Sequence, residues 1–133
     1  MPHPATEIVM YAARLIRQMR RELDLPAYLR VLSLLDELGA TGISQLATAD
    51  NCAQPTMSAQ IRQMEEDGYV SRRPHPDDAR SSLIELTSQG RTELTTMRHA
   101  LGEAAADRLG DCTAADVATT IHVLRTLTSE VPE

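Results

Sequence analysis

The sequence predicts a single domain that is mainly α-helical, with one small two-stranded β-hairpin. Apolar residues recur at helical spacing over most of the chain, whereas a stretch after residue 68 changes to short β-prone runs. The chain has three Tyr and neither Phe nor Trp, so aliphatic side chains and Met must fill the core, which suits helices. Its 133 residues are enough for one core, and we find no internal repeat or interdomain linker.

The first 39 residues predict two helices that a proline separates. Residues 5–23 carry apolar side chains at helical spacing. Pro26 interrupts the pattern and suits the first position of a second helix, which Gly39 ends as a C-cap. The apolar positions are Ile8, Ala12, Leu15, Met19 and Leu23 in the first helix, and Tyr28, Val31, Leu32, Leu35 and Leu38 in the second.

Two shorter helical segments follow, within residues 43–50 and 54–68. A turn of a few residues joins them, which is the pattern of a helix-turn-helix. In the second segment Pro55 suits the first helical position, Gln54 is a candidate cap, and Gly68 ends the helix. The spacing i, i+4, i+7 predicts a buried face made of Met57, Ile61 and Met64.

The next stretch predicts the hairpin. The runs YVSRRP and SSLIELT are β-prone, and the Pro and paired Asp of the intervening HPDDAR favour a turn. Ile84 and Leu86 share one face of the second strand. Because an isolated hairpin is marginally stable in water, we expect this one to pack against the helices.

The last part of the chain predicts two more helices. Thr87 suits the N-cap of a long helix that carries apolar residues as far as Leu109 and ends at Gly110. Residues 113–116, TAAD, resemble a capping box with Asp in place of the usual Glu. This box opens a final helix with four residues in register, Val117, Ile121, Leu124 and Thr128.

This order of elements, with the blocks LPAYLRVLSLL, GISQLA, QPTMSAQIRQMEEDGYVSRR and HPDDARSSLIELTSQG, resembles the MarR family of bacterial winged helix-turn-helix transcription regulators. The most specific block has Asp78-Ala79-Arg80 at the wing, then LT and a Gly three residues after the Thr. The resemblance covers nearly the whole chain. It departs from the family pattern at Ala53, where a Ser is frequent, and at Ala59, where a basic residue is common.

The resemblance implies one MarR-type domain over residues 1–133. Its winged helix-turn-helix DNA-binding region spans 26–90, and dimerisation helices span 5–24 and 92–131. One recognition helix and one wing contact too little DNA for a specific regulator, and a small monomeric core cannot bury all the apolar residues of the first and last helices. We therefore expect a homodimer that binds a pseudo-palindromic operator in double-stranded DNA, as a repressor.

The exposed face of the second helix of the helix-turn-helix supplies candidate DNA contacts. Its short polar residues allow close approach to the major groove, where Thr56 and Ser58 donate to bases or phosphates. Gln54 can pair with adenine, and Arg62 can reach guanine or a phosphate. The alternative is an ordinary solvated amphipathic helix. The candidate residues are Gln54, Pro55, Thr56, Ser58, Ala59, Arg62 and Gln63.

The hairpin supplies the remaining DNA candidates. By resemblance to the family, Arg80 enters the minor groove, and Asp78 orients this arginine. Arg72 and Arg73 flank the base of the hairpin and are expected to contact phosphates. The alternative for Arg80 and Asp78 is a solvent-exposed salt bridge in a turn.

The family commonly binds small phenolic or aromatic anions in a crevice between the dimerisation helices and the winged domain, so the resemblance also implies a small-molecule effector. Tyr11, Arg14, Arg17 and Tyr28 are the candidate ligand-binding residues. They are equally compatible with surface arginines and packed tyrosines. An effector that favours a dimer whose half-site spacing does not fit the operator DNA would relieve repression.

Composition restricts the other classes of function. A net charge of -6 and a pI of about 5.2 argue against a generic polyanion binder but allow a local basic stripe. No apolar run approaches the roughly 20 residues of a membrane span, and the N-terminus does not resemble a signal peptide. We expect a cytoplasmic protein with no membrane partner and with reduced cysteines.

No motif in the sequence indicates an enzyme or a cofactor, and the histidines lack metal-ligand spacing. Two alternatives to the DNA-binding regulator remain. Net acidity and Ala59 favour a winged-helix protein-interaction module without DNA binding. A redox-sensing regulator would use Cys52 or Cys112, although Cys52 suits a buried apolar position and Cys112 lies in a predicted loop.

Overall fold

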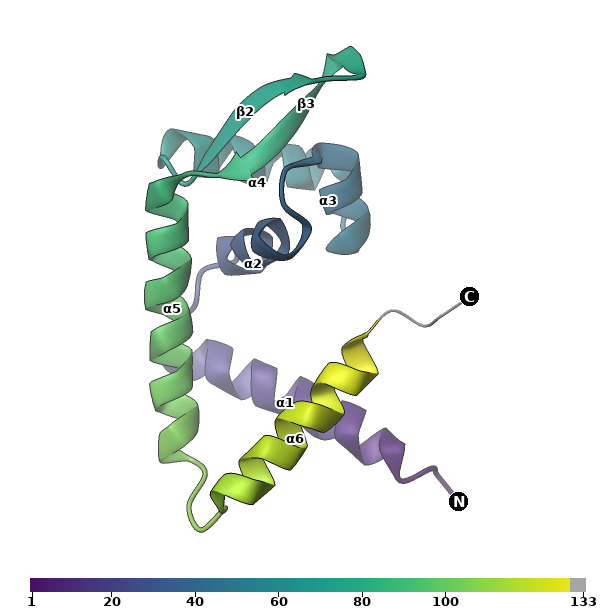
Figure 1. The fold of residues 1–133 in the computed structure, drawn as a ribbon, viewed down its shortest axis with the longest axis vertical. Coiled ribbons are helices and arrows are strands. Elements are labelled where there is room, and N and C mark those ends of the chain that lie inside the picture. Colours follow the sequence, from purple (N-terminus) through teal and green to yellow (C-terminus); the bar gives the residue numbers. More distant parts are fainter. Residues whose placement is uncertain (130–133) are drawn as a thin grey trace.

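The computed structural model describes residues 1–129, in which the long helix α5 joins two groups of elements (Figure 1). The wing and the short helices lie at one end of α5, and α1 and α6 lie toward the other end, where they overlap in this view. The elements are α1 (Ala5–Leu23), α2 (Tyr28–Leu38), β1 (Thr41–Gly42), α3 (Ile43–Ala49), α4 (Gln54–Glu66), β2 (Val70–His75), β3 (Asp78–Leu86), α5 (Ser88–Asp107) and α6 (Ala114–Thr128). The predicted mainly α fold with a β-hairpin wing is confirmed. The last residues of the expected 92–131 dimerisation segment, 130 and 131, lie outside the described range.

The core lies where α2, α3, α4 and α5 meet the inner face of the wing. Aliphatic side chains and methionines fill it, as the lack of large aromatics requires. The predicted buried face of α4 is confirmed, because its three apolar residues are almost completely shielded from solvent. The most deeply buried large side chains are Val31, Leu32, Leu46, Met57, Ile61, Met64 and Ile84.

The sheet has three strands in the order β1-β3-β2, one more than the sequence predicted. In β1, Thr41 pairs with Ile84 and Gly42 with Leu83, in antiparallel register. A strand of two residues cannot show an alternating pattern, so its pairing with β3 defines it. The expected packing of the hairpin against the helices is confirmed by Ile84 of β3, which is buried in the core together with side chains of α2, α3, α4 and α5.

The hairpin is longer than expected. β2 and β3 pair as far as His75 opposite Asp78, so only Pro76 and Asp77 remain for the turn. The predicted turn HPDDAR is therefore mostly strand. The register is irregular between Pro74 and His75, and this irregularity disturbs the alternation of side chains near the tip.

Two predicted helix ends were wrong by a few residues. Helix α2 begins at Tyr28, because Pro26 lies in the preceding turn and accepts a bond from the N–H of Leu29. Helix α5 ends at Asp107 rather than Gly110, so Leu109 lies exposed in the loop before α6. Apolar periodicity does not detect where a chain leaves the helix.

The predicted side-chain caps at the starts of α5 and α6 are confirmed. Thr87 accepts a bond from the N–H of Gly90 at 3.0 Å and begins α5. Thr113 and Asp116 form a reciprocal capping box at the start of α6. Gly39 ends α2 at φ 74°, a conformation that favours glycine. Within residues 1–129, no helix has both the length and the apolar character that crossing a membrane requires.

Candidate DNA-binding surface

Helix α4 presents a polar face to solvent because its apolar face packs into the core. The buried side chains of Met57, Ile61 and Met64 fix the rotation of the helix about its axis. Ser58 is half-buried, and the other predicted contact residues on α4 are exposed: Gln54, Pro55, Thr56, Ala59, Arg62 and Gln63. The structure therefore collects all seven at one surface.

The start of α4 differs from the prediction. Ala53 is the N-cap and has no side-chain cap bond, Gln54 is the first helical residue, and Pro55 is the second. The side chain of Gln54 accepts a hydrogen bond from Ser44 Oγ at 3.3 Å instead of capping the helix. This bond ties the beginning of α3 to the beginning of α4. Further along α4, the amide of Gln63 donates to Asp67 at 3.2 Å.

Arg72 and Arg73 lie on opposite faces of the wing. Arg72 pairs with the buried Ile84 across the hairpin, and its Nε donates to Glu65 Oε1 on α4 at 2.8 Å. Arg73 lies on the outer face, 3.4 Å from Glu85. Successive side chains of a strand point to opposite faces, so Arg72 and Arg73 cannot both contact DNA from the same face of the wing.

Arg80 and Asp78 are adjacent near the tip of the wing, as the sequence suggested. Asp78 Oδ1 accepts the backbone N–H of Arg80 at 3.0 Å and lies 3.6 Å from its Nε. Asp78 Oδ2 also accepts from Ser81 Oγ at 3.3 Å. The Arg80 side chain is 95% exposed, so it projects into solvent from the start of β3, where Asp78 holds the backbone N–H of Arg80.

His75 is a wing residue to which the sequence interpretation assigns no role. Its ring Nδ1 accepts the backbone N–H of Asp77 at 3.0 Å, and it lies in a groove that also contains Gln54, Arg72 and Arg80. A signal for this role of His75 is present in the sequence, because the segment HPDD has the pattern of a turn. A histidine directly before a Pro-Asp turn can bond that turn and still present a second ring nitrogen.

Tyr28 and Tyr69 pack together at the joint between α2, the end of α4 and α5. Their ring centroids are 5.4 Å apart, and Tyr69 Oη donates to Glu93 Oε2 at 3.4 Å. Desolvation, then the hydrogen bond with Tyr69 and the nearby Glu93, raise the pKa of Tyr28 to about 12. Tyr28 therefore occupies a packed position.

The other three predicted effector residues lie on the surface of α1. The guanidinium of Arg14 lies 5.0 Å from the ring centroid of Tyr11, a cation–π contact. Tyr11, Arg14 and Arg17 are all exposed. None of these residues, nor Tyr28, lines the apolar cavity that the same helix helps to form.

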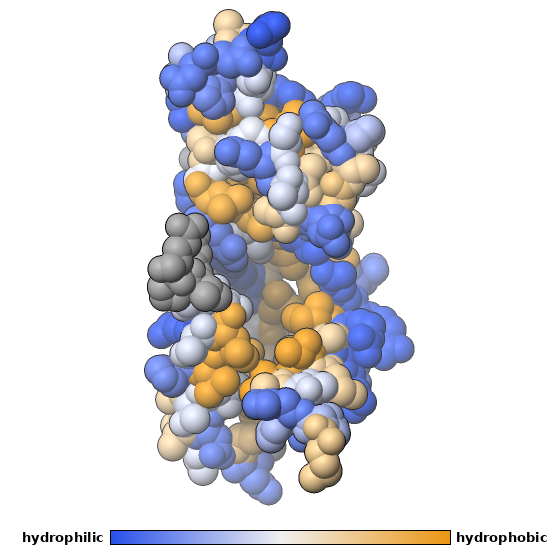
Figure 2. All heavy atoms as spheres, turned by 90° about the vertical axis from the view of Figure 1, so that its right-hand side faces the viewer, coloured by the Kyte–Doolittle hydropathy of each residue, from blue (hydrophilic) through white to orange (hydrophobic). Residues whose placement is uncertain are grey.

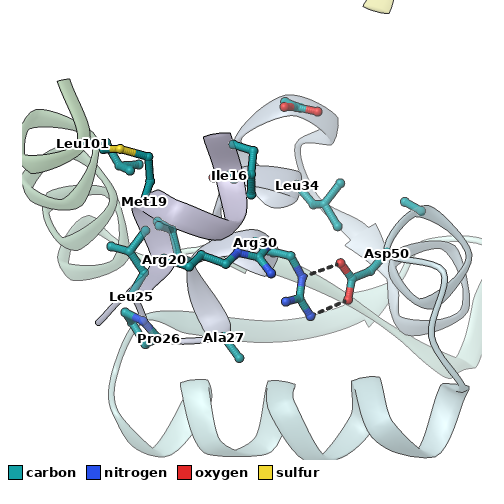
Figure 3. A pocket seen from close by; sticks show the side chains of 14 residues that line it. Ile16, Met19, Arg20, Leu25, Pro26, Ala27, Arg30, Leu34, Asp50 and Leu101 are labelled. Carbon is teal, nitrogen blue, oxygen red and sulfur yellow. Dashed lines mark hydrogen bonds and ion pairs between the residues drawn. The ribbon is translucent and has the colours of Figure 1, made fainter. Parts of the chain in front are cut away.

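This largely apolar cavity of about 490 Å³ lies between α1, α2, the end of α3 and α5 (Figure 3). Ile16, Met19 and Leu34 belong to its apolar wall. Arg30 forms two bonds with Asp50, Nε to Oδ1 at 3.1 Å and Nη2 to Oδ2 at 3.4 Å. The Asp50 side chain is only 6% exposed, so a nearly buried carboxylate pairs with an arginine on the cavity wall.

Cys112 is exposed in the loop before α6, as predicted, whereas Cys52, expected to be buried, is half-buried against the core. In the described part of the chain, no three His, Cys, Asp or Glu side chains gather where they could hold a metal ion.

Comparison with known proteins identifies the family. The MarR family model matches residues 26–82. An uncharacterized HTH-type transcriptional regulator of Mycobacterium bovis is 33% identical over 109 residues, which cover 79% of this chain and 76% of that protein. The HTH-type transcriptional repressor IacR of Pseudomonas putida is 31% identical over 90 residues, 68% of this chain and 52% of IacR.

Solved structures agree with the fold. A mutant MarR from E. coli superposes with a TM-score of 0.77 at 20% identity, covering 97% of this chain and 98% of that one. The same mutant complexed with operator DNA gives a TM-score of 0.62 at 21% identity, over 95% and 94% of the two chains. The fold, the family model and the curated relatives agree, and the chain is therefore a member of the MarR family, a DNA-binding transcriptional regulator of the helix-turn-helix type rather than an enzyme.

Proposed function

We propose that the protein is a repressor that binds a pseudo-palindromic operator as a homodimer. Helix α4 enters the major groove, and the wing formed by β2 and β3 lies over the neighbouring minor groove. The observation that carries this proposal is the exposed polar face of α4 beside a wing whose tip extends the 95% exposed Arg80. The repressor named in Pseudomonas putida and the E. coli protein complexed with operator DNA support it.

Each set of DNA-facing residues has its own role in this proposal. Thr56, Ser58 and Gln63 approach base edges, and Arg62 reaches a guanine or a phosphate. Arg80 enters the minor groove while Asp78 holds the backbone that carries it. Pro55 and Ala59 leave room for close approach because their side chains are small. Arg73 contacts phosphate from the outer face of the wing.

The homodimer explains the exposed apolar residues of α1 and α6. None of the residues of α6 is buried, although a helix of this length is marginal in water without packing. Figure 2 shows apolar side chains gathered on the lower part of the molecule, where these two helices lie. The exposed set includes Ile8, Val9, Met10, Leu15, Ile16, Ile121, Leu124 and Leu127. A second copy that packs on this surface buries it and pairs two recognition helices.

The cavity beside Arg30 supports an effector site. Its volume of about 490 Å³ suits a small molecule, and its apolar wall with Arg20 and Arg30 suits an aromatic anion. A ligand that binds Arg30 competes with Asp50, which is the C-cap of α3. Since that carboxylate is nearly buried, losing its partner strains the turn before α4. Effector binding thereby disfavours the DNA-binding conformation.

The decisive experiment is selection of duplexes from a randomised library by the full chain, followed by sedimentation of the free protein. We expect an enriched sequence with two-fold symmetry and a dimer at micromolar concentration. Failure to bind any duplex at low salt would favour the protein-interaction module instead. Mild peroxide treatment tests the redox alternative, and unchanged DNA affinity after treatment removes it.

A further inference from the structure

A polar groove of about 360 Å³ separates the beginnings of α3 and α4 from the wing. Ser44 and Gln54 lie on the helical side, and Arg72, His75 and Arg80 lie on the wing side. These residues come from four elements, so only the folded chain brings them together.

Two hydrogen-bond acceptors in this groove, one on Gln54 and one on His75, are already in use. Gln54 Oε1 accepts from Ser44 Oγ at 3.3 Å, and His75 Nδ1 accepts from the N–H of Asp77 at 3.0 Å. The amide N–H groups of Gln54 therefore remain as donors, and the proton of neutral His75 lies on Nε2. Neither donor has an acceptor among residues 1–129.

Arg72 adds an oriented cation. Its Nε donates to Glu65 at 2.8 Å, and the side chains of this pair are 33% and 37% exposed. Because Glu65 uses only the Nε–H, the two terminal nitrogens of the guanidinium keep their donors for another acceptor. Glu65 thus fixes the direction in which Arg72 presents its charge.

The irregular register of the hairpin explains how His75 joins this set. Strict alternation places His75 on the outer face with Arg73. The register shift between Pro74 and His75 breaks that alternation, and His75 lines the same groove as Arg72. Arg80, at the rim, adds a second positive charge.

We propose that this groove binds one phosphate group of the DNA backbone. A phosphodiester carries a negative charge and offers only acceptors, which matches a groove that offers N–H donors and two arginines. Gln54, His75 and the terminal nitrogens of Arg72 bind its oxygens, and Ser44 and Glu65 are positioning residues. The proposal rests on the DNA-binding function proposed above and changes one role, because Gln54 contacts phosphate and not adenine.

The first test measures the affinity of Gln54→Ala, His75→Ala and Arg72→Ala for the selected operator and for an unrelated duplex. Each variant should weaken both complexes by the same factor, about tenfold for a charge-assisted bond. Arg72→Ala should also lower the salt slope by about 0.9 for each phosphate that it no longer neutralises. A Gln54→Ala variant that weakens the operator alone would show base recognition and overturn the proposal.

The second test replaces single phosphates of the operator with neutral methylphosphonates. A methylphosphonate at one position should weaken wild-type binding about tenfold. The same substitution should weaken binding by Arg72→Ala or His75→Ala little further. Additive effects at every position would overturn the proposal. His99→Ala, an exposed histidine on α5, is the matched control and should respond like wild type at every position.

Two further outcomes separate this proposal from others. If wild type binds no duplex, the proposed function fails before the groove is tested; if it binds and the variants bind equally well, only the groove assignment is overturned. Circular dichroism of each variant excludes misfolding as the cause.

Discussion

A side chain at Gly90 would overlap the carbonyl oxygen of Tyr69, so α5 can pack against the start of the wing only where residue 90 lacks one. Thr87 completes this joint: its hydroxyl donates to Gly68 O at 2.6 Å and accepts from Gly90 N at 3.0 Å. The N–H of Thr87 also donates to Tyr69 O at 3.0 Å. The Thr and Gly of the LTSQG block thus connect the end of α4, the wing and α5.

Gly90→Ala should destabilise the protein by about 1–3 kcal/mol, because backbone atoms cannot move aside as a flexible side chain can. Gly102→Ala is the control on the same helix. A Cβ there meets nothing within 4 Å, so better helix propensity should stabilise the chain by up to about 1 kcal/mol. Urea unfolding of both variants checks the prediction, and equal effects would contradict it.

Stability should fall in alkaline solution partly because of Tyr28. Its folded pKa of about 12 exceeds the ordinary tyrosine value of 10.0, so the folded state holds the phenolic proton more tightly than the unfolded state. This contribution is fully present below pH 10 and is lost as pH rises to about 12.

The Tyr28→Phe variant removes that titration and keeps the ring against Tyr69. Unfolding free energies measured at about pH 9 and about pH 11, on either side of the ordinary tyrosine pKa, should therefore differ less in the variant than in wild type. The same loss of stability in both proteins would show that other groups cause the alkaline destabilisation.

Arg30→Met should destabilise the protein by about 1–3 kcal/mol, because it leaves the nearly buried Asp50 carboxylate without its cation. Asp50→Asn should cost less, since the half-exposed Arg30 then remains solvated. Arg91→Met is the control: Arg91 is 66% exposed, 3.6 Å from Asp36, and should cost less than about 1 kcal/mol. Thermal and urea unfolding of the three variants measure this ranking of stability losses.

Leu124→Glu should dissociate the proposed homodimer, because it places a charge in the apolar surface of α6. Leu38→Glu is the matched control, since Leu38 is 52% exposed at the end of α2, beside residues of β1 and α3. Sedimentation at micromolar concentration should show a monomer for the first variant and a dimer for the second. Dimers in both would place the interface elsewhere.

Arg80→Ala should weaken operator binding and reduce the salt slope by about 0.9 for each phosphate whose charge Arg80 neutralises. Its effect should be larger on operators with A·T pairs beneath the wing, where a narrow minor groove attracts arginine. Arg21→Ala, an exposed arginine on α1, should leave both quantities unchanged. Anisotropy titrations over a salt series measure them, and an unaltered slope for Arg80→Ala would remove the wing contact from the proposal.

Much of the fold was predictable because helical periodicity is a local property. The buried face of α4, the capping residues Thr87 and Thr113, and the hairpin each have a signal within a few residues. The strand β1 had none, since its two residues are extended only because β3 lies beside them. The start of α2 at Tyr28 and the end of α5 at Asp107 were also not predicted correctly, because the pattern of side chains says little about where the terminal backbone hydrogen bonds form.

The candidate site divides in the same way. The sequence by itself determined that α4 has a polar face and that an Asp-x-Arg stands near the tip of a wing, since both follow from spacing along one element. Only the tertiary structure decided that Arg72 turns toward Glu65 while Arg73 turns away, and that His75 joins Gln54 in one groove. Those relations depend on strand register and on the distance between elements far apart in the chain, which no local pattern encodes.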